Sequence, residues 1–186
     1  MISKNEIERV AANRGLSPKN CERNYLLDIV LFNLYRISRR ELVFKGGTCL
    51  FKLYGLNRFS EDLDFTLTKN KFDIKGALSR VIASVRAGGI KIKIKNTSEY
   101  RKGINILLEC YGPLFDGSKE SITYIPLNIS KREPVFSAQN NLVVSYYSDI
   151  PSYEVYGMGE AEIAAEKVRA LLTRTKPRDL YDIWFL

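Results

Sequence analysis

Residues 44–67, FKGGTCLFKLYGLNRFSEDLDFTL, constrain the fold more than any other segment of the chain. Residues 42–44 are apolar and predict a short buried strand, and the glycine pair that follows lets the backbone turn tightly. A short helix is expected after this turn and should end at Gly55. Residues 62–67 predict a second strand. A strand, a glycine turn, a helix and a strand in this order indicate mixed α and β structure.

The rest of the chain continues this mixture, and its 186 residues, 45% of them hydrophobic, are enough to bury one core. The further expected helices are 4–13, 20–38, 74–87, a segment from Glu160 to Pro177, and 178–186. The further expected strands are 90–95, 104–111 and 121–129, and 131–158 predict irregular or short β structure. We therefore expect an α+β fold with a mixed β-sheet and flanking helices.

The C-terminal residues carry two apolar patterns. In the helix from Glu160, one apolar face is formed by Ala164, Ala165, Val168, Leu171 and Leu172. The chain ends on the apolar residues 183–186, which we expect to pack on the domain, on a partner chain or on a further helical extension.

The glycine turn is a candidate phosphate-binding site. Gly46 and Gly47 let the backbone approach a ligand closely, and the N–H groups of the new helix, with the Thr48 hydroxyl, can bind phosphate oxygens. Lys45 and Lys52 flank the turn and add positive charge. Taken alone, an ordinary strand-to-helix turn explains this pattern about as well.

Asp62 and Asp64 are candidate metal ligands. Residues i and i+2 of a strand lie on one face, so both carboxylates project together while Leu63 enters the core. Their like charges raise each other's pKa, and a cation between them relieves the repulsion. Mg²⁺ prefers oxygen ligands and shares them with substrate phosphates. The alternative is an exposed strand end with two solvated acids.

The turn and the carboxylates together favour metal-assisted phosphoryl chemistry. Arg58 and Ser60 lie just before the carboxylates, where they can contact phosphates or brace the loop. The chain has no histidine, which excludes Ser-His-Asp and Cys-His catalysis and every His-ligated metal site. Its three cysteines are far apart in sequence and form no CxxC pair. We therefore expect neither a disulfide framework nor a structural zinc site.

Charge and hydropathy bound the partners of the protein. The net charge of +8 favours polyanions, nucleic acid above all, although an ordinary basic surface is the alternative. No apolar run approaches the ~20 residues of a membrane span. The N-terminal residues lack the apolar core of a signal peptide, so we expect a cytoplasmic protein without membrane contact.

The motif GGT followed by RFSEDLDF resembles the glycine and DxD motifs of the DNA polymerase β-type nucleotidyltransferase superfamily. Within it, the chain is similar to the AbiEii/AbiGii toxin family of bacterial and archaeal abortive-infection and toxin–antitoxin systems. That family also carries a lysine-bearing helix and an RDxxD segment, which match AEKVRALLTR and KPRDLYD here. The resemblance covers residues 42–186.

The resemblance implies a polymerase β-like core with N-terminal helices at residues 1–158 and a C-terminal helical segment at 159–186 that completes the active site. It implies that Asp62 and Asp64 ligate Mg²⁺, with Mn²⁺ as an alternative, and that Lys167 pairs with the phosphates. Either Asp179 or Asp182 would complete the site. The implied nucleotide-binding residues are Gly46, Gly47, Thr48, Lys52, Arg58, Ser60 and Arg178.

Simpler interpretations remain for two of these residues. Lys167 is alternatively a solvated helix lysine, and Asp179 an acid placed at a helix N-terminus for the dipole. The sequence also departs from the family pattern. Many related enzymes have a third metal-binding carboxylate on a later strand, where this chain carries Asn128, with Glu109 on the preceding strand. Family members often continue into a larger C-terminal helical region, which leaves acceptor recognition open.

The resemblance implies a Mg²⁺-dependent nucleotidyltransferase that moves a nucleotide from a nucleoside triphosphate to an acceptor hydroxyl, with a tRNA 3′ end as the expected acceptor. A protein hydroxyl and a small alcohol are the alternatives. The enzyme would be the toxin of a toxin–antitoxin or abortive-infection system, neutralised by an antitoxin protein. The competing hypothesis is a catalytically silent nucleotide- or RNA-binding module.

Overall fold

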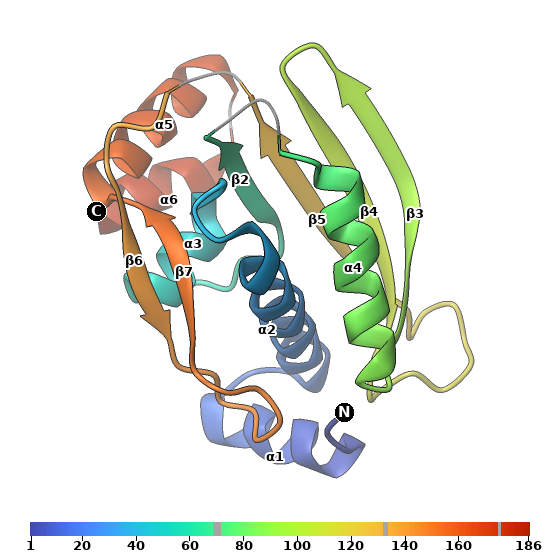
Figure 1. Ribbon diagram of the computed structural model, residues 1–186. Coiled ribbons are helices and arrows are strands. Elements are labelled where there is room, and N and C mark those ends of the chain that lie inside the picture. The colour runs from blue at the N-terminus through green and yellow to red at the C-terminus, as the bar shows by residue number, and fades with distance from the viewer. Residues whose placement is uncertain (69–71, 132–133, 175) are drawn as a thin grey trace.

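A computed structural model of the chain describes residues 1–68, 72–131, 134–174 and 176–186. The described residues form one seven-stranded sheet with strand order β3-β4-β5-β2-β1-β7-β6 (Figure 1). The strands are β1 Leu42–Lys45, β2 Leu63–Leu67, β3 Lys91–Tyr100, β4 Gly103–Tyr111, β5 Thr123–Ser130, β6 Ala138–Val143 and β7 Tyr153–Met158. The helices are α1 Lys4–Arg14, α2 Pro18–Ser38, α3 Gly46–Leu53, α4 Ile74–Ala87, α5 Glu160–Thr173 and α6 Pro177–Phe185. The expected α+β fold with a mixed sheet and flanking helices is confirmed.

The sheet is mixed at its centre, and this determines which side chains share a face. β1 pairs antiparallel with β2 and parallel with β7, whereas β2 pairs parallel with β5. Asp64 on β2 is thereby placed opposite Lys45 on one neighbouring strand and opposite Asn128 on the other. Paired residues of neighbouring strands project to the same side of a sheet. One lysine, one aspartate and one asparagine therefore meet on a single face.

The other face of the sheet carries the hydrophobic core. α2 begins at Pro18 after the Ser17 side chain, which accepts a hydrogen bond from the Asn20 amide at 3.2 Å. The helix is buried along most of its length, because it packs on the sheet, on α1 and on α4 (Figure 1). Phe44 and Phe65 meet it from the central strands, and their rings lie 5.5 Å apart. Burial of each such side chain contributes about 1.5–3 kcal/mol to the free energy of unfolding.

β3 differs from the sequence prediction, whereas the short β structure expected in residues 131–158 is present. β3 extends to Tyr100, five residues beyond the predicted end, because it pairs with β4 along its whole length across a bulge between Ile94 and Asn96. Its second half, NTSEY, lacks the apolar alternation on which the prediction depended. The segment 131–158 contains two strands, β6 and β7, that pair with each other at the edge of the sheet.

The predicted apolar face of α5 is wrong as the packing face of that helix. Val168 is 46% exposed and Leu172 is 82% exposed, whereas Ile163 and Lys167 are the buried residues. The reason is that α5 contacts the site through a stripe containing Lys167, which is held by ion pairs rather than by apolar contact. At the C-terminus, Phe185 packs against the core while Trp184 is 77% exposed.

Within the described residues, no helix combines the length and the hydropathy needed to cross a membrane.

Candidate active site

The glycine turn joins β1 to α3 and brings the backbone into contact with the carboxylate strand. Gly46 has φ +74°, and a Cβ atom added there would lie 2.5 Å from the Asp64 Oδ2 atom. A Cβ atom at Gly47 would lie 2.8 Å from Arg58 Nη2 and 2.9 Å from Ser60 Oγ. At position 46, only glycine satisfies both the left-handed backbone and the close approach, whereas at Gly47 the close approach alone favours glycine. The two glycines therefore let the turn, Asp64, Arg58 and Ser60 surround one space.

The first turn of α3 presents backbone amides to this space. Its N-cap residue is Lys45, and a lysine side chain has no acceptor with which to cap the helix. The N-terminal N–H groups of a helix carry partial positive charge and bind anions. The expected role of Gly46 and Gly47 in binding phosphate thus has a geometric basis.

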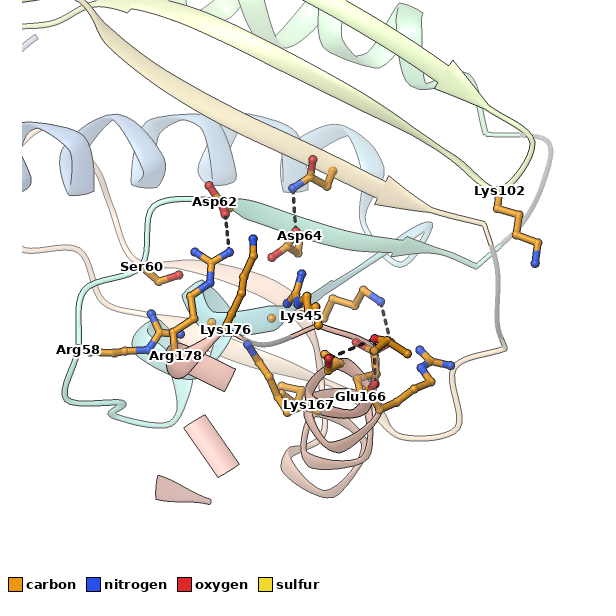
Figure 2. Close-up of a pocket in the computed structure, with 18 residues that line it drawn as sticks. Lys45, Arg58, Ser60, Asp62, Asp64, Lys102, Glu166, Lys167, Lys176 and Arg178 are labelled. Atoms are coloured by element: carbon orange, nitrogen blue, oxygen red, sulfur yellow. Dashed lines mark hydrogen bonds and ion pairs between the residues drawn. The ribbon is translucent and has the colours of Figure 1, made fainter. Parts of the chain in front are cut away.

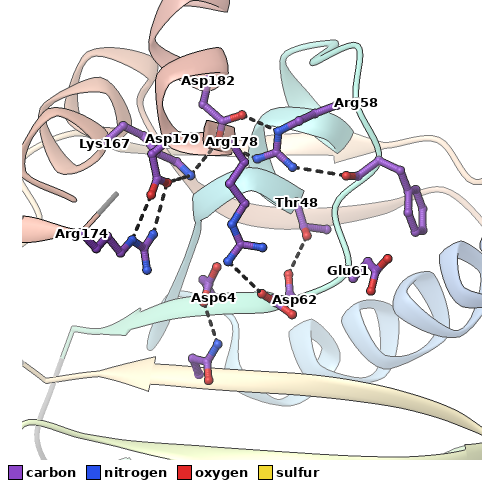
Figure 3. Close-up of polar contacts among 12 residues, drawn as sticks. Thr48, Arg58, Glu61, Asp62, Asp64, Lys167, Arg174, Arg178, Asp179 and Asp182 are labelled. Atoms are coloured by element: carbon purple, nitrogen blue, oxygen red, sulfur yellow. Dashed lines mark hydrogen bonds and ion pairs between the residues drawn. The ribbon is translucent and has the colours of Figure 1, made fainter. Parts of the chain in front are cut away.

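Thr48 occupies a different place from the one expected. Its side chain is fully buried, and its hydroxyl donates a hydrogen bond to the backbone carbonyl of Asp62 at 2.5 Å (Figure 3). The hydroxyl is turned away from the cavity because the third residue of the helix faces the loop that leads into β2. Thr48 therefore positions the carboxylate segment, and its hydroxyl does not line the cavity in which phosphates would bind.

Asp62 and Asp64 project into one cavity, as their spacing predicts. Asp62 lies immediately before β2 and Asp64 lies on it. The Asp64 Oδ1 atom accepts a hydrogen bond from Asn128 Nδ2 at 2.9 Å, and Asp62 Oδ2 lies 3.8 Å from Arg178 Nη2 (Figure 3). Burial raises the pKa of Asp64, and the neighbouring Asp62 charge raises it further. The Asn128 hydrogen bond, Lys45 and Lys167 lower it, but burial outweighs them.

Asp179 and Asp182 form the second carboxylate pair, and they lie behind the cavity wall. Both side chains are 0% exposed, and neither lines the cavity. Asp182 accepts hydrogen bonds from Arg58 Nε and Nη2, each at 2.6 Å, and pairs with Lys167 Nζ at 2.6 Å. Asp179 pairs with Lys167 Nζ at 3.1 Å and with Arg174 Nε at 2.9 Å (Figure 3).

One aspartate of the RDxxD segment was expected to complete the site, and the structure places both of them behind the cavity lining rather than in it. Both aspartates lie on one face of α6, as their i, i+3 spacing predicts, but that face points to three cations. Burial raises the pKa of Asp179, yet the hydrogen bonds from Arg174 and Lys167 outweigh it and hold the pKa below its ordinary value. The two carboxylates therefore orient Arg58, Lys167 and Arg174 on the cavity wall.

Lys167 is not a solvated helix lysine. Its side chain is largely buried, and its ammonium group lies between Asp179 and Asp182 at the cavity wall. Asp179 lies in the first turn of α6, where the helix dipole favours an acid, but it is also fully buried and paired with Lys167 and Arg174.

The cavity has a volume of about 730 Å³ and a strongly cationic lining (Figure 2). Its basic lining residues are Lys45, Arg58, Lys102, Lys167, Arg169, Arg174, Lys176 and Arg178, and its acidic ones are Asp62, Asp64 and Glu166. Glu166 is already paired with Lys45 at 2.6 Å. The excess positive charge around two central carboxylates suits a polyphosphate that arrives with a divalent cation.

Several of these lining residues were not identified from the sequence. Glu166, Ala170 and Thr173 lie on α5, and Arg174 is its C-cap residue. Ala170 and Arg174 follow Lys167 at helical spacing, so a helical projection of the lysine-bearing segment could have found these two. Lys102 lies in the turn between β3 and β4, and no local pattern connects it to the motifs.

Lys52 does not belong to the site, contrary to the expectation from the sequence. Its ammonium group pairs with Asp28 Oδ1 at 2.5 Å and donates to Asn24 Oδ1 at 2.8 Å, and it is absent from the cavity lining. Lys52 lies at the far end of α3 from the glycine turn and points to α2. Its side chain is 5% exposed, so it stabilises the packing of α3 on α2.

The donor set fits one divalent cation with open positions. Asp62 and Asp64 supply two carboxylates to the cavity. Asn128 lies beside Asp64, at the strand position where related enzymes were expected to carry a third carboxylate. Glu109 lies elsewhere, paired with Lys93 at 2.9 Å. Among the residues that the structure describes, no group of three or more Cys, Asp or Glu is arranged to hold a metal. A Mg²⁺ ion here would need phosphate oxygens and water to complete its coordination.

Comparison with known proteins agrees with this geometry. The family model described as "Nucleotidyl transferase AbiEii toxin, Type IV TA system" matches residues 30–186. Among solved structures, the protein JHP933 from Helicobacter pylori superposes with a TM-score of 0.67 at 29% identity, over 92% of this chain and 67% of that one. MenT4, a nucleotidyltransferase toxin from Mycobacterium tuberculosis H37Rv, superposes with a TM-score of 0.70 at 22% identity.

The MenT4 match covers 98% of this chain but 63% of MenT4, so the chain spans less than two thirds of that protein. No curated protein matches the sequence significantly. The family match, in contrast, includes the glycine turn, both carboxylate pairs and Lys167. Because it extends over most of the chain, the protein belongs to the AbiEii family of nucleotidyltransferase toxins of type IV toxin–antitoxin systems.

Proposed function

We propose that the protein transfers a nucleotide from a nucleoside triphosphate to a hydroxyl group of an acceptor RNA, such as a tRNA 3′ end, with Mg²⁺ held by Asp62 and Asp64. The observation that carries this proposal is the position of these two carboxylates at the centre of a cavity with eight basic lining residues. Such a cavity neutralises the charge of a triphosphate, and the carboxylates supply oxygen ligands for its metal.

The residues of the cavity divide the work of phosphoryl transfer. The amides of the Gly46–Gly47 turn, with Ser60, bind phosphate oxygens. Arg58 and Lys167 are fixed by Asp182 and stabilise the charge that develops on the leaving pyrophosphate. Arg178 lies beside Asp62 and contacts the triphosphate. When bound, Mg²⁺ (or Mn²⁺) polarises the α-phosphate and favours ionisation of the acceptor hydroxyl.

The net charge of +8 supports RNA as the acceptor over a protein or a small alcohol. Family membership supports a cytoplasmic toxin that is neutralised by an antitoxin protein, and we propose both for this chain.

The test is label transfer from each of four α-labelled nucleoside triphosphates to total tRNA, with Mg²⁺ present or chelated. We expect label in RNA from one preferred nucleotide with the wild type, and none with Asp64→Ala. The matched control is Asp116→Ala, which removes an exposed aspartate from the β4–β5 loop and should keep activity. Label in protein would contradict the RNA acceptor, and activity in Asp64→Ala would contradict the metal site.

The second candidate function is a catalytically silent nucleotide- or RNA-binding module. The observation that favours it is Asn128, which bonds to Asp64 where related enzymes place a third carboxylate. This candidate predicts that a nucleoside triphosphate binds, as measured by calorimetry, while no label is transferred to any acceptor and no pyrophosphate is released.

A further inference from the structure

The catalytic carboxylate lies at one end of a polar row that crosses the sheet. Asp64 pairs with Asn128 on β5, Asn128 pairs with Asn105 on β4, and Asn105 pairs with Ser98 on β3. Cross-strand partners project to the same side, so these four side chains lie on one face. We call the part of this face on β3, β4 and β5 the open sheet face. It is continuous with the active site.

The opposite side of the same three strands is the core side. Residues that alternate with the polar row, such as Ile92, Ile106 and Leu127, are buried, and α4 contacts β3 while α2 contacts β5 on that side (Figure 1). On the open sheet face, by contrast, Lys91, Lys95 and other side chains of β3 are exposed.

Tyrosines and lysines lie beside one another at the far end of the open sheet face. The next row on this face consists of Pro126, Leu107 and Asn96. Beyond it, Tyr124 pairs with Glu109 and Glu109 with Lys93, and in the row after that Tyr111 pairs with Lys91. Lys95 Nζ lies 4.0 Å from the centre of the Tyr124 ring, and Lys91 Nζ lies 4.6 Å from that of Tyr111. The acid of this group, Glu109, is bonded to Lys93 and Tyr111, so its charge is neutralised locally.

Tyr100 brings a third ring close to the catalytic centre. It pairs with Gly103, and a Cβ atom added at Gly103 would lie 2.6 Å from Tyr100 Oη and 2.8 Å from Tyr100 Cζ. The glycine therefore leaves room for the ring to lie across the sheet. Tyr100 is 42% exposed and, with Asn105, Asn128 and Asp64, lines a second cavity of about 370 Å³ that adjoins the first.

We propose that the open sheet face binds a single-stranded segment of the acceptor RNA and leads its reactive end to Asp64. Bases stack on tyrosine rings irrespective of sequence, and lysines beside the rings neutralise phosphates. Tyr124 and Asn128 are four positions apart on β5, about 13 Å along the strand, so the rings lie within a few nucleotides of the metal site. This proposal rests on the proposed function and names the surface that serves it.

The charge pattern favours RNA over an acidic protein. An acidic protein would form ion pairs with the lysines but would not need the tyrosine rings beside them. Single-stranded nucleic acid contacts both, because its phosphates pair with lysines and its bases stack on the rings. Variants of the tyrosine rings therefore distinguish RNA binding from binding of an acidic protein.

The test is binding of a fluorescently labelled single-stranded RNA, followed by anisotropy in EDTA and without nucleotide. Lys91→Gln/Lys95→Gln should weaken binding about tenfold and reduce the slope of log affinity against log salt by roughly 1.4, for two phosphate contacts. The matched control is Lys4→Gln/Lys19→Gln, which removes the same charge from α1 and α2 at exposed positions and should change affinity less than twofold.

The stacking part of the proposal is tested at Tyr100. Tyr100→Leu should weaken RNA binding at least fivefold, and Tyr100→Phe, which keeps the ring, should bind like the wild type. Thermal unfolding verifies that each variant is folded. Equal losses in both lysine pairs, or undiminished binding by Tyr100→Leu, would overturn the proposal.

The binding assay and the label-transfer assay fail independently. RNA binding that depends on the open sheet face without any label transfer supports this surface and contradicts the nucleotidyltransferase activity. Label transfer with unchanged RNA affinity in the surface variants supports the activity and contradicts the surface.

Discussion

The protein contains two pairs of closely spaced aspartates, and the structure uses them in opposite ways. Asp62 and Asp64 face the cavity, with one hydrogen bond from Asn128 and an arginine at 3.8 Å. Asp179 and Asp182 are sealed at 0% exposure and are bonded to cations, among them Lys167. The carboxylates of the first pair face the cavity with few cationic partners from the protein, so they can bind a ligand. The carboxylates of the second pair are neutralised by cations within the protein.

This difference shows that the environment of an aspartate, rather than its spacing, determines its role. Two carboxylates without enough cations repel each other, which favours a metal ion between them. Two carboxylates with matching cations form a rigid network, and removing one partner leaves buried charge uncompensated. Loss of the first pair should therefore lower activity with little change in stability. Loss of the second pair should lower stability, and it should lower activity only through the orientation of Arg58 and Lys167.

The largest expected effect is on catalysis by the first pair. Asp62→Asn removes a metal-binding charge, which should lower the rate of nucleotide transfer about 10³-fold, equivalent to roughly 4 kcal/mol. Because Asp62 lies at the cavity surface, its free energy of unfolding should change by less than about 1 kcal/mol. Single-turnover label transfer and urea unfolding measure the two effects. Wild-type activity in a stably folded Asp62→Asn protein would contradict the catalytic role of the first pair.

The second pair should show the reverse balance. Asp182→Ala removes the buried carboxylate partner of Arg58 and one of the two carboxylate partners of Lys167, and it should lower the free energy of unfolding by about 3 kcal/mol. For a chain of this size, that corresponds to a fall of roughly 6–12 °C in Tm. Leu180→Ala, at an exposed position of the same helix, is the control and should change stability by under about 0.5 kcal/mol. Equal effects of the two variants on Tm would refute the stabilising network.

The glycine turn tests whether the first pair needs its close backbone approach. Gly46 and Gly55 both have positive φ, so alanine at either should cost about 1 kcal/mol of stability. A Cβ atom would meet the Asp64 carboxylate at Gly46 but finds nothing within 4 Å at Gly55. Gly46→Ala should therefore lower activity roughly 10–100-fold, while Gly55→Ala keeps it. Similar activities would show that the approach to Asp64 is unimportant.

The smallest expected effect is an opposite pH dependence of the two pairs. Burial raises the pKa of Asp64, so its contribution to stability is full below the ordinary pKa of 3.8 and is lost as pH rises through the raised value. Hydrogen bonds from Arg174 and Lys167 outweigh burial and lower the pKa of Asp179, so its contribution is present above 3.8 and is lost as pH falls through the lowered value.

Metal-free Asp64→Asn should therefore gain stability relative to the wild type, by under about 1 kcal/mol, as pH rises from about 4 to 7. Asp179→Asn should show its full loss at pH 7 and a smaller loss in strong acid. Urea unfolding at a series of pH values measures both. Parallel pH profiles of the two variants would show that the pairs share one environment.

Short-range sequence patterns predicted much of the fold and of the candidate site. The bounds of α4 agree with the predicted helix 74–87, which the glycine pair 88–89 ends. The shared face of Asp62 and Asp64 follows from i, i+2 geometry. The same reasoning failed for α5, because apolar spacing identifies an apolar stripe but does not say which stripe is buried. It failed for Lys52 because proximity to a motif in sequence does not give the direction of a side chain.

The sequence by itself determined that this chain has a glycine turn, two carboxylate pairs and a lysine-bearing helix in a family-specific order. It did so because each motif is a short run of residues, and the resemblance to the family depends on these runs and on their order. Only the tertiary structure decided which carboxylates face the cavity. Arg58 meets Asp182 across 124 positions of sequence, and Asp64 meets Asn128 across 64. Contacts at such separations arise from strand order and helix packing, which no local pattern encodes.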